Sequence, residues 1–321
     1  MLQIVLEQPG RFVARQAADP RPAPGEVLLR VRRIGICGTD LHAFVGRQPF
    51  FEYPRVLGHE LGAEVLESAT PALKPGARAA VEPYLHCGRC GVCRAGRYNC
   101  CETLKCLGVH TDGGMCQLLC VPERLVHESD TLSFDQLALV ETLGIGAHAV
   151  ARAALAAEER VLVVGAGPIG LATAQFALEA GGHVRVLEPN PLRRAAAERF
   201  GATAIAEPDG TLFDVVFDAT GSAAAMAGSL RHAAHGGRVV FVGLTLDPVP
   251  IDDPLLHRRE LTILASRNSC HDFPRIMRLI DEGRIDTRPW ITHRLNLKDV
   301  PERFAAIRES PGLLKAMIDV D

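Results

Sequence analysis

Residues 161–170 read Val-Leu-Val-Val-Gly-Ala-Gly-Pro-Ile-Gly, and this stretch decides the fold of the surrounding half of the chain. Its apolar first part is typical of a strand buried on both faces of a parallel sheet. The remainder fits G-x-G-x-x-G, a pattern that turns the chain tightly and begins a helix. The residues that we expect beside the pyrophosphate of a dinucleotide are Gly165, Gly167, Pro168, Ile169 and Gly170.

Strand-like and helix-like segments alternate after this turn. The expected strands cover 183–187, 214–218, 238–243 and 261–264, and the expected helices cover 169–180, 192–200 and 223–234. Such alternation predicts a doubly wound α/β parallel sheet with right-handed crossovers. A glycine-rich turn in an α/β domain without any cofactor is the alternative interpretation.

The second expected strand is followed by an acidic residue. Glu188 comes 18 residues after Gly170 (188 − 170). A carboxylate there can accept hydrogen bonds from the adenosine ribose and would repel a 2′-phosphate, which favours NAD over NADP. Arg193 lies nearby and weakens this inference, because a guanidinium could hold a phosphate.

The chain has 10 cysteines, and all but Cys270 lie between Cys37 and Cys120. Clustered cysteines in a long chain without an export signal favour metal ligation over disulfides. The pattern C-x2-C-x2-C-x7-C predicts a closed, structural zinc site whose ligands are Cys87, Cys90, Cys93 and Cys101. The neighbouring Cys100 is an alternative fourth ligand. A nucleic-acid-binding zinc ribbon is a rival interpretation, which the scarcity of aromatic and basic residues around the lobe argues against.

Composition limits the classes of partner. The chain of 321 residues has 35 basic and 38 acidic side chains and a net charge of −3. This balance gives no electrostatic reason to expect nucleic acid or an anionic membrane as a partner. The N-terminal sequence lacks a basic region followed by a long apolar run, so we expect a cytoplasmic protein.

Short strand-like runs separated by Pro and Gly dominate the chain before residue 130, and they predict a β-rich domain. Three segments there and just beyond carry metal-binding residue types: 37–42 (Cys-Gly-Thr-Asp-Leu-His), 58–60 (Gly-His-Glu) and 139–141 (Leu-Val-Glu). Each segment alone is a weak indication of a metal site, since a single cysteine or histidine is more often part of a hydrophobic core.

Together with the cysteine lobe and the glycine motif, in this order, the segments resemble the zinc-containing medium-chain dehydrogenase/reductase family, in particular its polyol (sorbitol-like) dehydrogenase branch. The resemblance implies a Rossmann domain inserted in a GroES-like catalytic domain. The implied boundaries are 1–142 and 268–321 for the GroES-like domain, whose zinc lobe is 87–101, and 143–267 for the Rossmann domain. Two amphipathic helices expected at 273–282 and 300–309 would return to the first domain.

The resemblance also implies roles for individual residues. Cys37 and His59 match ligands of a catalytic zinc, Glu141 matches the remaining ligand, and Glu60 matches a carboxylate that is either a ligand or a close neighbour of the metal. Thr39 matches the hydroxyl beside the substrate oxygen, and His42 the outer end of a proton relay. The segments that match the lining of the ribose and nicotinamide include Thr220, Val242, Gly243 and Leu244.

These assignments predict two zinc ions per chain and hydride transfer from a secondary alcohol of a polyol, sugar or sugar acid to NAD. An NADP-dependent reductase of simple aldehydes or ketones is one alternative, and a non-catalytic cofactor-binding relative is another. The family resemblance further implies a homodimer or homotetramer. Ala43 and Thr142 depart from the polyol branch, which usually has an aromatic residue and a proline at these positions.

Three further residues have both a functional and a structural interpretation. His110 and Arg267 could face a substrate or lie on the surface. Lys315 could contact the pyrophosphate or be solvated.

Overall fold

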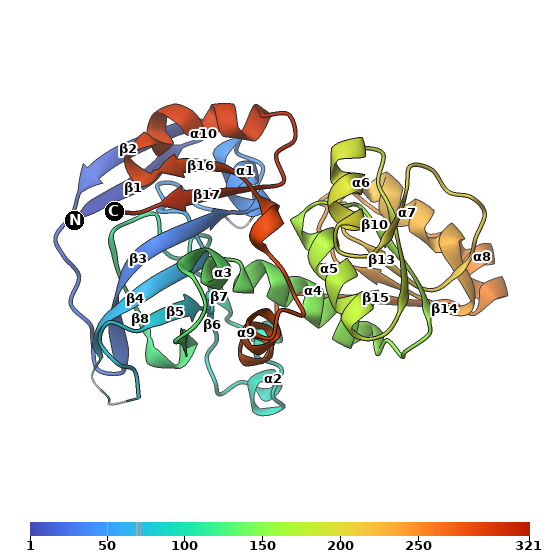
Figure 1. Cartoon of the computed structure of the whole chain (residues 1–321), viewed down its shortest axis with the longest axis horizontal. Coiled ribbons are helices and arrows are strands. Elements are labelled where there is room, and N and C mark those ends of the chain that lie inside the picture. The colour runs from blue at the N-terminus through green and yellow to red at the C-terminus, as the bar shows by residue number, and fades with distance from the viewer. Residues whose placement is uncertain (50, 69, 71) are drawn as a thin grey trace. The chain divides into compact units, whose positions relative to one another are not determined.

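The computed structural model describes residues 1–49, 51–68, 70 and 72–321. The chain forms two compact units (Figure 1). The first consists of Met1–Glu141, Phe273–Gly283 and Thr287–Asp321, and the second of Thr142–Asp272 and Arg284–Asp286. The sequence-based boundaries lie at 142/143 and 267/268. Both predicted tail helices lie in the first unit.

The first unit is built on a mostly antiparallel sheet with the strand order β16-β17-β3-β4-β5-β9, in which β8 also pairs with β3. Strands β1–β2 and β6–β7 form two smaller sheets. The strands of this unit are β1 (Leu2–Gln8), β2 (Arg11–Gln16), β3 (Glu26–Ile36), β4 (Glu60–Ser68), β5 (Arg78–Val81), β6 (Tyr84–Leu85), β7 (Lys105–Cys106), β8 (Leu118–Pro122), β9 (Val126–Ser129), β16 (Ile291–Asn296) and β17 (Lys315–Asp319).

Short helices surround these strands. They are α1 (Gly38–Phe44), α2 (Gly91–Arg94), α3 (Phe134–Ala138), α9 (Phe273–Asp281) and α10 (Val300–Glu309), with 3₁₀ turns at Tyr98–Cys100, Glu123–Leu125, Arg288–Trp290 and Leu297–Asp299. Helix α4 (Val140–Ala153) begins in the first unit and continues into the second.

The core of the first unit follows from alternation along β3. Val27, Leu29 and Val31 are completely buried in the same hydrophobic cluster, while the residues between them are half-buried. Successive side chains of a strand point to opposite faces, so this pattern fixes which face of β3 meets the core.

The register of the main sheet brings distant residues to one end of it. Gly35 near the end of β3 is opposite Glu60 at the start of β4, and Ile36 is opposite Ala316 on β17. Cys37 therefore leaves β3 beside the beginnings of two neighbouring strands. This arrangement positions the candidate site described below.

The second unit contains a parallel sheet with the strand order β12-β11-β10-β13-β14-β15, which is the doubly wound order of a dinucleotide-binding fold. Residues 161–164 are buried in the predicted strand. The strands are β10 (Arg160–Val164), β11 (His183–Leu187), β12 (Thr203–Ile205), β13 (Phe213–Asp218), β14 (Ala233–Phe241) and β15 (Thr262–Ala265).

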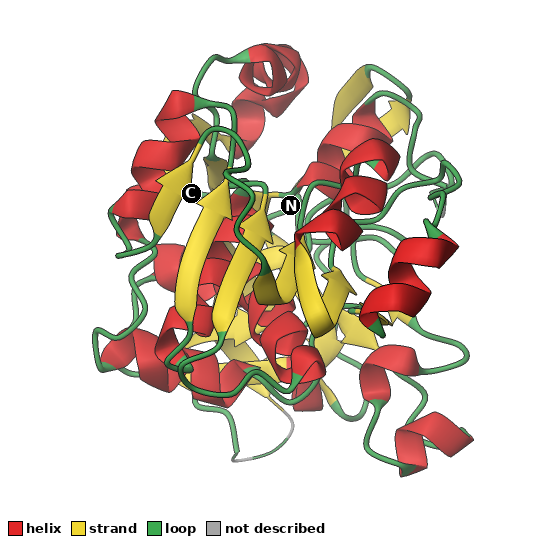
Figure 2. Ribbon diagram, turned by 90° about the vertical axis from the view of Figure 1, so that its right-hand side faces the viewer, coloured by secondary structure: helices red, strands yellow, loops and turns green. Residues whose placement is uncertain are grey.

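Helices flank this parallel sheet, as Figure 2 shows. Helix α5 packs against β10 and β11, α6 against β12, and α7 against β13 and β14. Their bounds are α5 (Pro168–Glu179), α6 (Pro191–Glu198), α7 (Ala223–Ser229) and α8 (Asp253–Arg259), with a 3₁₀ turn at Leu230–His232.

One predicted helix of this unit is too long, and two elements, strand β12 and helix α8, were missed. The helix expected at 223–234 ends at Ser229, and Ala233 already belongs to β14, where it pairs with Phe213. Pairing in the sheet outweighs the local helix preference of this alanine-rich segment. Strand β12 has only three residues and gives no periodic signal.

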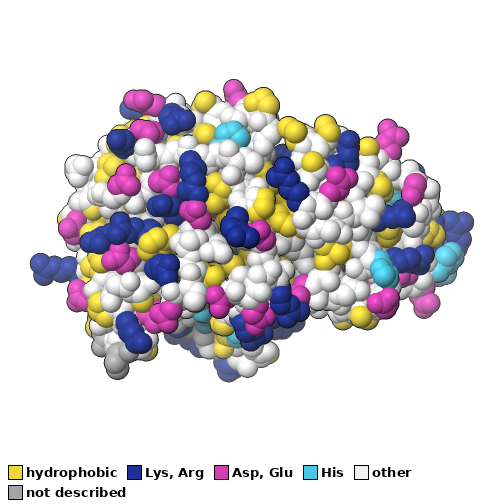
Figure 3. All heavy atoms as spheres, in the orientation of Figure 1, with side chains coloured by type: hydrophobic (Ala, Val, Ile, Leu, Met, Phe, Trp, Pro, Cys, Tyr) yellow, Lys and Arg dark blue, Asp and Glu magenta, His cyan; other side chains and the backbone are white. Residues whose placement is uncertain are grey.

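Basic and acidic side chains are interspersed on the face drawn in Figure 3, as the nearly balanced charge of the sequence suggests. None of the helices in the described part of the chain combines the length and apolar character that crossing a bilayer requires.

Replacing Gly62 by alanine should destabilise the first unit. A Cβ atom at Gly62 would lie 2.2 Å from the carbonyl oxygen of Phe134, where α3 approaches β4. Relief of this overlap should cost about 1–3 kcal/mol of unfolding free energy, measured by chemical denaturation. Gly228→Ala in α7 is the control, because its Cβ would meet nothing within 4 Å. Equal stability of Gly62→Ala and the wild type would contradict this close packing.

Candidate functional site

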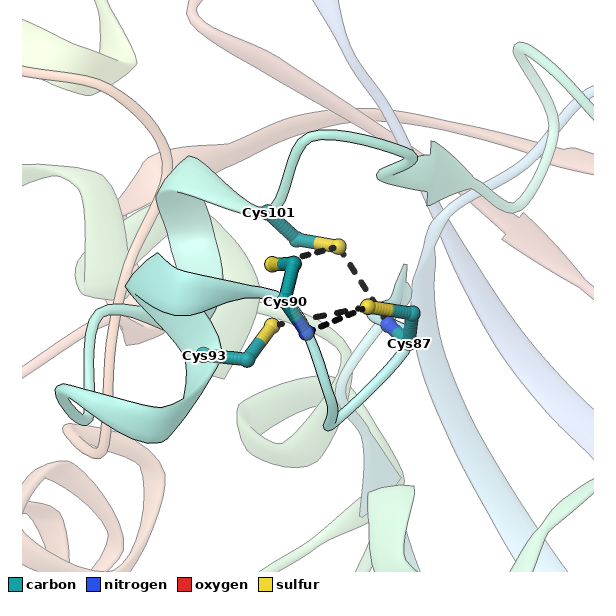
Figure 4. A group of neighbouring side chains, drawn as sticks. All are labelled: Cys87, Cys90, Cys93 and Cys101. Carbon is teal, nitrogen blue, oxygen red and sulfur yellow. Dashed lines mark hydrogen bonds between the residues drawn. The ribbon is translucent and has the colours of Figure 1, made fainter.

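The structure gathers the four predicted lobe cysteines. The Sγ atoms of Cys87, Cys90, Cys93 and Cys101 all lie within 4.8 Å of one another (Figure 4). Cys90 precedes α2, Cys93 lies within it, and Cys101 follows a 3₁₀ turn. All four are free thiols, and the Cys87–Cys93 and Cys90–Cys101 sulfur distances are both 4.0 Å. Four sulfurs at this separation fit a tetrahedral zinc ion without an open position.

Backbone groups of the lobe favour thiolates. The amides of Cys87 and Cys90 donate to the sulfurs of Cys101 and Cys87, both at 3.3 Å. Hydrogen bonds from the amides of Arg89 and Cys90 lower the pKa of Cys87 to about 6. Burial raises the pKa of Cys93 to about 12, so the loop does not favour all four thiolates equally.

Cys100, the alternative fourth ligand, does not belong to this group of sulfurs in the described chain. Its Sγ lies 4.0 Å from the guanidinium of Arg97. The 3₁₀ turn over Tyr98–Cys100 directs Cys101, the residue after it, toward the other cysteines.

A second group forms where β3 ends and β4 begins. One ligand atom each from Cys37, His59 and Glu60 lies within 4.8 Å of the other two. His59 and Glu60 are buried and Cys37 is half-buried. A thiol, an imidazole and a carboxylate are ligands that zinc accepts, and together they fit a catalytic site in which one position stays open.

Asp40 lies beside this group, and the sequence analysis gave it no role. Its Oδ2 accepts a hydrogen bond from the amide of Cys37 at 2.9 Å. Its Oδ1 lies 3.7 Å from Nδ1 of His59, and neither of these two buried atoms has a hydrogen-bond partner in the structure. Burial alone lowers the pKa of His59, but Asp40 and Cys37 outweigh burial and raise this pKa well above its ordinary value. A buried imidazole beside a thiol, with Nδ1 left without a hydrogen-bond partner, is a further observation that fits a metal ligand.

Glu60 is held by Lys315. Both carboxylate oxygens of Glu60 lie 2.6 Å from Nζ of Lys315, and the ammonium also donates to the carbonyl oxygen of Ile36 at 3.4 Å. Lys315 is 2% exposed, so the alternative of a solvated lysine is wrong, and its ammonium faces Glu60. Burial lowers the pKa of Lys315, but the neighbouring carboxylate outweighs burial and raises this pKa.

Glu141, predicted as a zinc ligand, lies outside the group formed by Cys37, His59 and Glu60. It is buried near the start of α4, and its Oε1 accepts a hydrogen bond from the hydroxyl of Tyr84 on β6. Burial raises the pKa of Glu141, while the positive charge of His59 lowers it. The hydrogen bond to Tyr84 accounts for the orientation of this carboxylate.

Tyr84 and Cys106 were not predicted from the sequence as residues of the site. They are cross-strand partners on β6 and β7, and burial raises the pKa of the Cys106 thiol to about 12. Single residues on two-residue strands give no pattern that could have indicated a place beside the predicted metal ligands.

The predicted relay residues both lie on α1. Thr39 is half-buried in its first turn, and His42 is exposed in its last turn. Of the residues with two interpretations, His110 and Arg267 are both exposed.

In the second unit the glycine motif has the predicted geometry. Gly165 has a φ of +95°, which only glycine adopts readily. A Cβ at Gly170 would lie 1.9 Å from the carbonyl oxygen of Gly165, whereas one at Gly167 would meet no atom within 4 Å. Gly167 precedes α5 and Pro168 is its first residue, so the helix presents its amides beside open space.

Glu188 follows β11 and is buried next to this turn. Its Oε2 accepts a hydrogen bond from the amide of Ala166 at 2.8 Å, and its Oε1 from the amide of Asn190 at 2.9 Å. The glycine turn and the acid are thus joined directly by a hydrogen bond. Arg193 is half-buried on α6, and its backbone amide donates to the side chain of Asn190.

The remaining predicted cofactor residues follow the next two parallel strands, whose carboxyl ends share one edge of the sheet. The hydroxyl of Thr220 donates to Asp218 at 2.7 Å. The amides of Val242 and Gly243 donate to the carbonyl oxygen of Asp218. Leu244 is 66% exposed. Ligands of doubly wound sheets bind at this edge.

Comparison with known proteins agrees with both halves of the structure. Residues 23–131 match the alcohol dehydrogenase GroES-like domain, and residues 168–282 match the zinc-binding dehydrogenase domain. The chain belongs to the zinc-containing medium-chain dehydrogenase/reductase family. The predicted family and the predicted GroES-like and Rossmann folds are therefore confirmed.

Relatives within this family are similar over nearly the whole chain. L-galactonate-5-dehydrogenase of Escherichia coli K12 is 41% identical over 94% of this chain and 93% of its own length. Sorbitol dehydrogenase of Bacillus subtilis is 33% identical over 91% and 90%. A zinc-binding dehydrogenase of Sinorhizobium meliloti, solved with NADP, has a TM-score of 0.91 and is 33% identical, over 99% of this chain and 98% of that one. The chain is thus a zinc-type alcohol or polyol dehydrogenase that uses a nicotinamide cofactor.

Cys90→Ser should remove the zinc of the lobe. We expect the zinc content, measured by elemental analysis, to fall by one ion per chain and the unfolding free energy to fall by several kcal/mol. Cys100→Ser is the matched control, because Cys100 lies outside the sulfur group. Loss of zinc in the Cys100 variant alone would reverse the assignment.

Proposed function

We propose that the chain oxidises a secondary alcohol of a polyol, sugar or sugar acid, with NAD as the hydride acceptor and two zinc ions per chain. The grouping of Cys37, His59 and Glu60 at one buried end of the main sheet carries this proposal. The names of two relatives, a galactonate and a sorbitol dehydrogenase, support the substrate class.

We assign the catalytic zinc to Cys37 and His59, with Glu60 or Glu141 as the carboxylate ligand, and the structural zinc to the four lobe cysteines. Bound zinc would supply a Lewis acid that lowers the pKa of a substrate hydroxyl, and bound NAD a hydride acceptor. The substrate loses one hydride and one proton, and its alcohol becomes a carbonyl group.

The residues of the chain move the proton and orient the reactants. The Thr39 hydroxyl accepts the proton of the substrate hydroxyl while it gives up its own proton. With NAD bound, that proton would pass by way of the cofactor ribose to the exposed imidazole of His42, which exchanges protons with water. The carboxylate of Asp40, 3.7 Å from Nδ1 of His59, attracts this imidazole electrostatically and so favours its orientation. The Tyr84 hydroxyl fixes one oxygen of Glu141 and so limits how this carboxylate turns.

Glu188 is the proposed reader of the adenosine ribose. Its buried carboxylate accepts two amide hydrogen bonds and retains lone pairs for ribose hydroxyls, while its charge would repel a 2′-phosphate. An NADP-dependent reductase of simple aldehydes or ketones is the second candidate, favoured by the NADP-bound relative and by Arg193.

Cys37→Ser should lower kcat by about a thousandfold, because a Lewis acid contributes several kcal/mol to such a reaction. The Kd for NAD, measured by fluorescence titration, should stay unchanged. Cys120→Ser provides the control, since this half-buried thiol on β8 belongs to neither cysteine group. Steady-state rates over polyols, aldonates and simple alcohols form the assay. Wild-type turnover in Cys37→Ser would exclude Cys37 from the site.

Glu188→Gln should lower the ratio of kcat/KM with NAD to that with NADP by at least about tenfold, or 1.4 kcal/mol. Glutamine keeps an acceptor for the amide of Ala166 but removes the charge that opposes a 2′-phosphate. Arg193→Ala should leave the preference for NAD unchanged. A preference that changes only in the arginine variant would make Arg193 the reader and favour the NADP-dependent alternative.

A further inference from the structure

A completely buried acid ends one of the two central strands of the parallel sheet. Asp218 is the last residue of β13, which lies between β10 and β14 in the second unit. The register of the sheet pairs Asp218 with Val164 at the end of β10 and with Phe241 at the end of β14. Asp218 is therefore level with the beginnings of three loops that leave the same edge of the sheet.

The carboxylate of Asp218 binds the loop that follows its own strand. Its Oδ1 accepts hydrogen bonds from the amide of Thr220 at 3.0 Å and from the hydroxyl of Thr220 at 2.7 Å. Its Oδ2 accepts a hydrogen bond from the hydroxyl of Ser229 on α7 at 2.8 Å. A buried carboxylate requires such donors, and these donors come from the loop and from the helix after it. Asp218 thus connects this loop to α7.

The backbone of the same residue binds the loop after β14. The carbonyl oxygen of Asp218 accepts hydrogen bonds from the amides of Val242 at 2.9 Å and Gly243 at 3.0 Å. A Cβ atom at Gly243 would lie 2.3 Å from the amide nitrogen of Gly221, so the two loops are in contact through their backbones. One residue therefore fixes both of the loops that carry the predicted ribose and nicotinamide contacts.

Thr220 is exposed, yet its hydroxyl is directed inward. The hydroxyl donates its single proton to Asp218 and accepts a hydrogen bond from the amide of Ser222 at 3.1 Å. A Cβ atom at Gly165 would lie 3.2 Å from Cγ2 of Thr220, so the methyl group of this threonine faces the glycine turn. Asp218 thereby determines which side of Thr220 lies toward the glycine turn.

We propose that Asp218 is a positioning residue for the nicotinamide half of the cofactor, because it holds residues 219–222 and 242–244 in their binding conformation before the cofactor arrives. Loops that are ordered in advance lose less conformational entropy on binding. This inference rests on the cofactor contacts assigned in the proposed function. The adenosine half of the cofactor depends instead on the glycine turn and on Glu188.

Asp218→Ala tests this division with two ligands. NADH covers the whole cofactor site, whereas ADP lacks the nicotinamide and its ribose. Because the variant loses the hydrogen bonds of the carboxylate to Thr220 and Ser229, the Kd for NADH, measured by fluorescence titration, should rise about tenfold. The Kd for ADP, measured by calorimetry, should rise less than about twofold, whereas a general loss of folded protein would weaken both ligands equally.

Asp218→Asn should restore binding of NADH. Its amide oxygen can accept the two hydrogen bonds from Thr220, and its NH₂ group can donate to the hydroxyl of Ser229. That hydroxyl can in turn donate to the carbonyl oxygen of Ala225, which lies 3.0 Å away. Recovery in this variant would show that the hydrogen bonds position the loops, whereas an asparagine variant no better than the alanine variant would contradict the proposal.

Asp214→Ala is the matched control. Asp214 lies near the other end of β13 and forms an ion pair with Arg160 at 2.8 Å, away from the three loops. The Kd values for NADH and ADP should both stay at the wild-type level in this variant.

Thr220→Val provides a second test that leaves Asp218 in place, should Asp218→Ala not fold. Valine has nearly the volume of threonine but lacks the hydroxyl that donates to Asp218 at 2.7 Å. The Kd for NADH should rise about threefold and the Kd for ADP should not change. The double variant Asp218→Ala/Thr220→Val should bind NADH no more weakly than Asp218→Ala, because both changes remove the same contact.

An unchanged Kd for NADH in Asp218→Ala or in Thr220→Val would overturn the proposal, and so would equal losses of NADH and ADP affinity in Asp218→Ala. Failure of the proposed function is a separate result. The wild-type protein would then bind NADH and respond to Asp218→Ala as expected, but it would oxidise no alcohol of the panel.

Discussion

Every buried charge in the first unit must have a partner, and this requirement determines how the charged side chains at the end of the main sheet are paired. Asp40, Glu60, Glu141 and Lys315 are all buried within one small region, together with His59. Lys315 neutralises Glu60, and Asp40 accepts an amide hydrogen bond from Cys37. The two buried atoms that remain unpartnered, Nδ1 of His59 and Oδ1 of Asp40, adjoin the predicted metal ligands. A divalent cation fits such a region because the negative charge of the buried carboxylates exceeds the positive charge of Lys315, and a bound cation would neutralise the difference.

In both units a glycine allows another group to approach the backbone closely. In the first, glycine at position 35 lets the Glu60 carboxylate lie against the backbone of β3. In the second, glycine at 170 lets helix α5 pack against the turn after β10, and Gly167 leaves open space beside the start of this helix. Each of these two sites lies at the end of a strand. In each, a glycine without a side chain lets another group lie directly against the backbone.

The sequence predicted the features that depend on local pattern. The apolar run at 161–164 and the glycine turn after it identified the parallel sheet, and cysteine spacing alone identified the lobe. Contacts between single polar residues far apart in the chain were not predictable. Tyr84 and Glu141 are separated by 57 positions, and Lys315 and Glu60 by 255. Nothing near Lys315 distinguishes it from a solvated lysine, because its burial follows from the pairing of β17 with β3.

The first unit is discontinuous: it begins with residues 1–141 and is completed by 287–321, which follow the whole of the second unit. On a ribosome the nucleotide-binding half is therefore available to fold before the last strand of the other half has been made. Until β17 emerges, Glu60 lacks the ammonium that neutralises it in the folded chain. A metal ion bound beside Cys37 and His59 would therefore meet its final surroundings only after β17 has paired with β3, whereas the lobe cysteines lie close together in the sequence and are all made early.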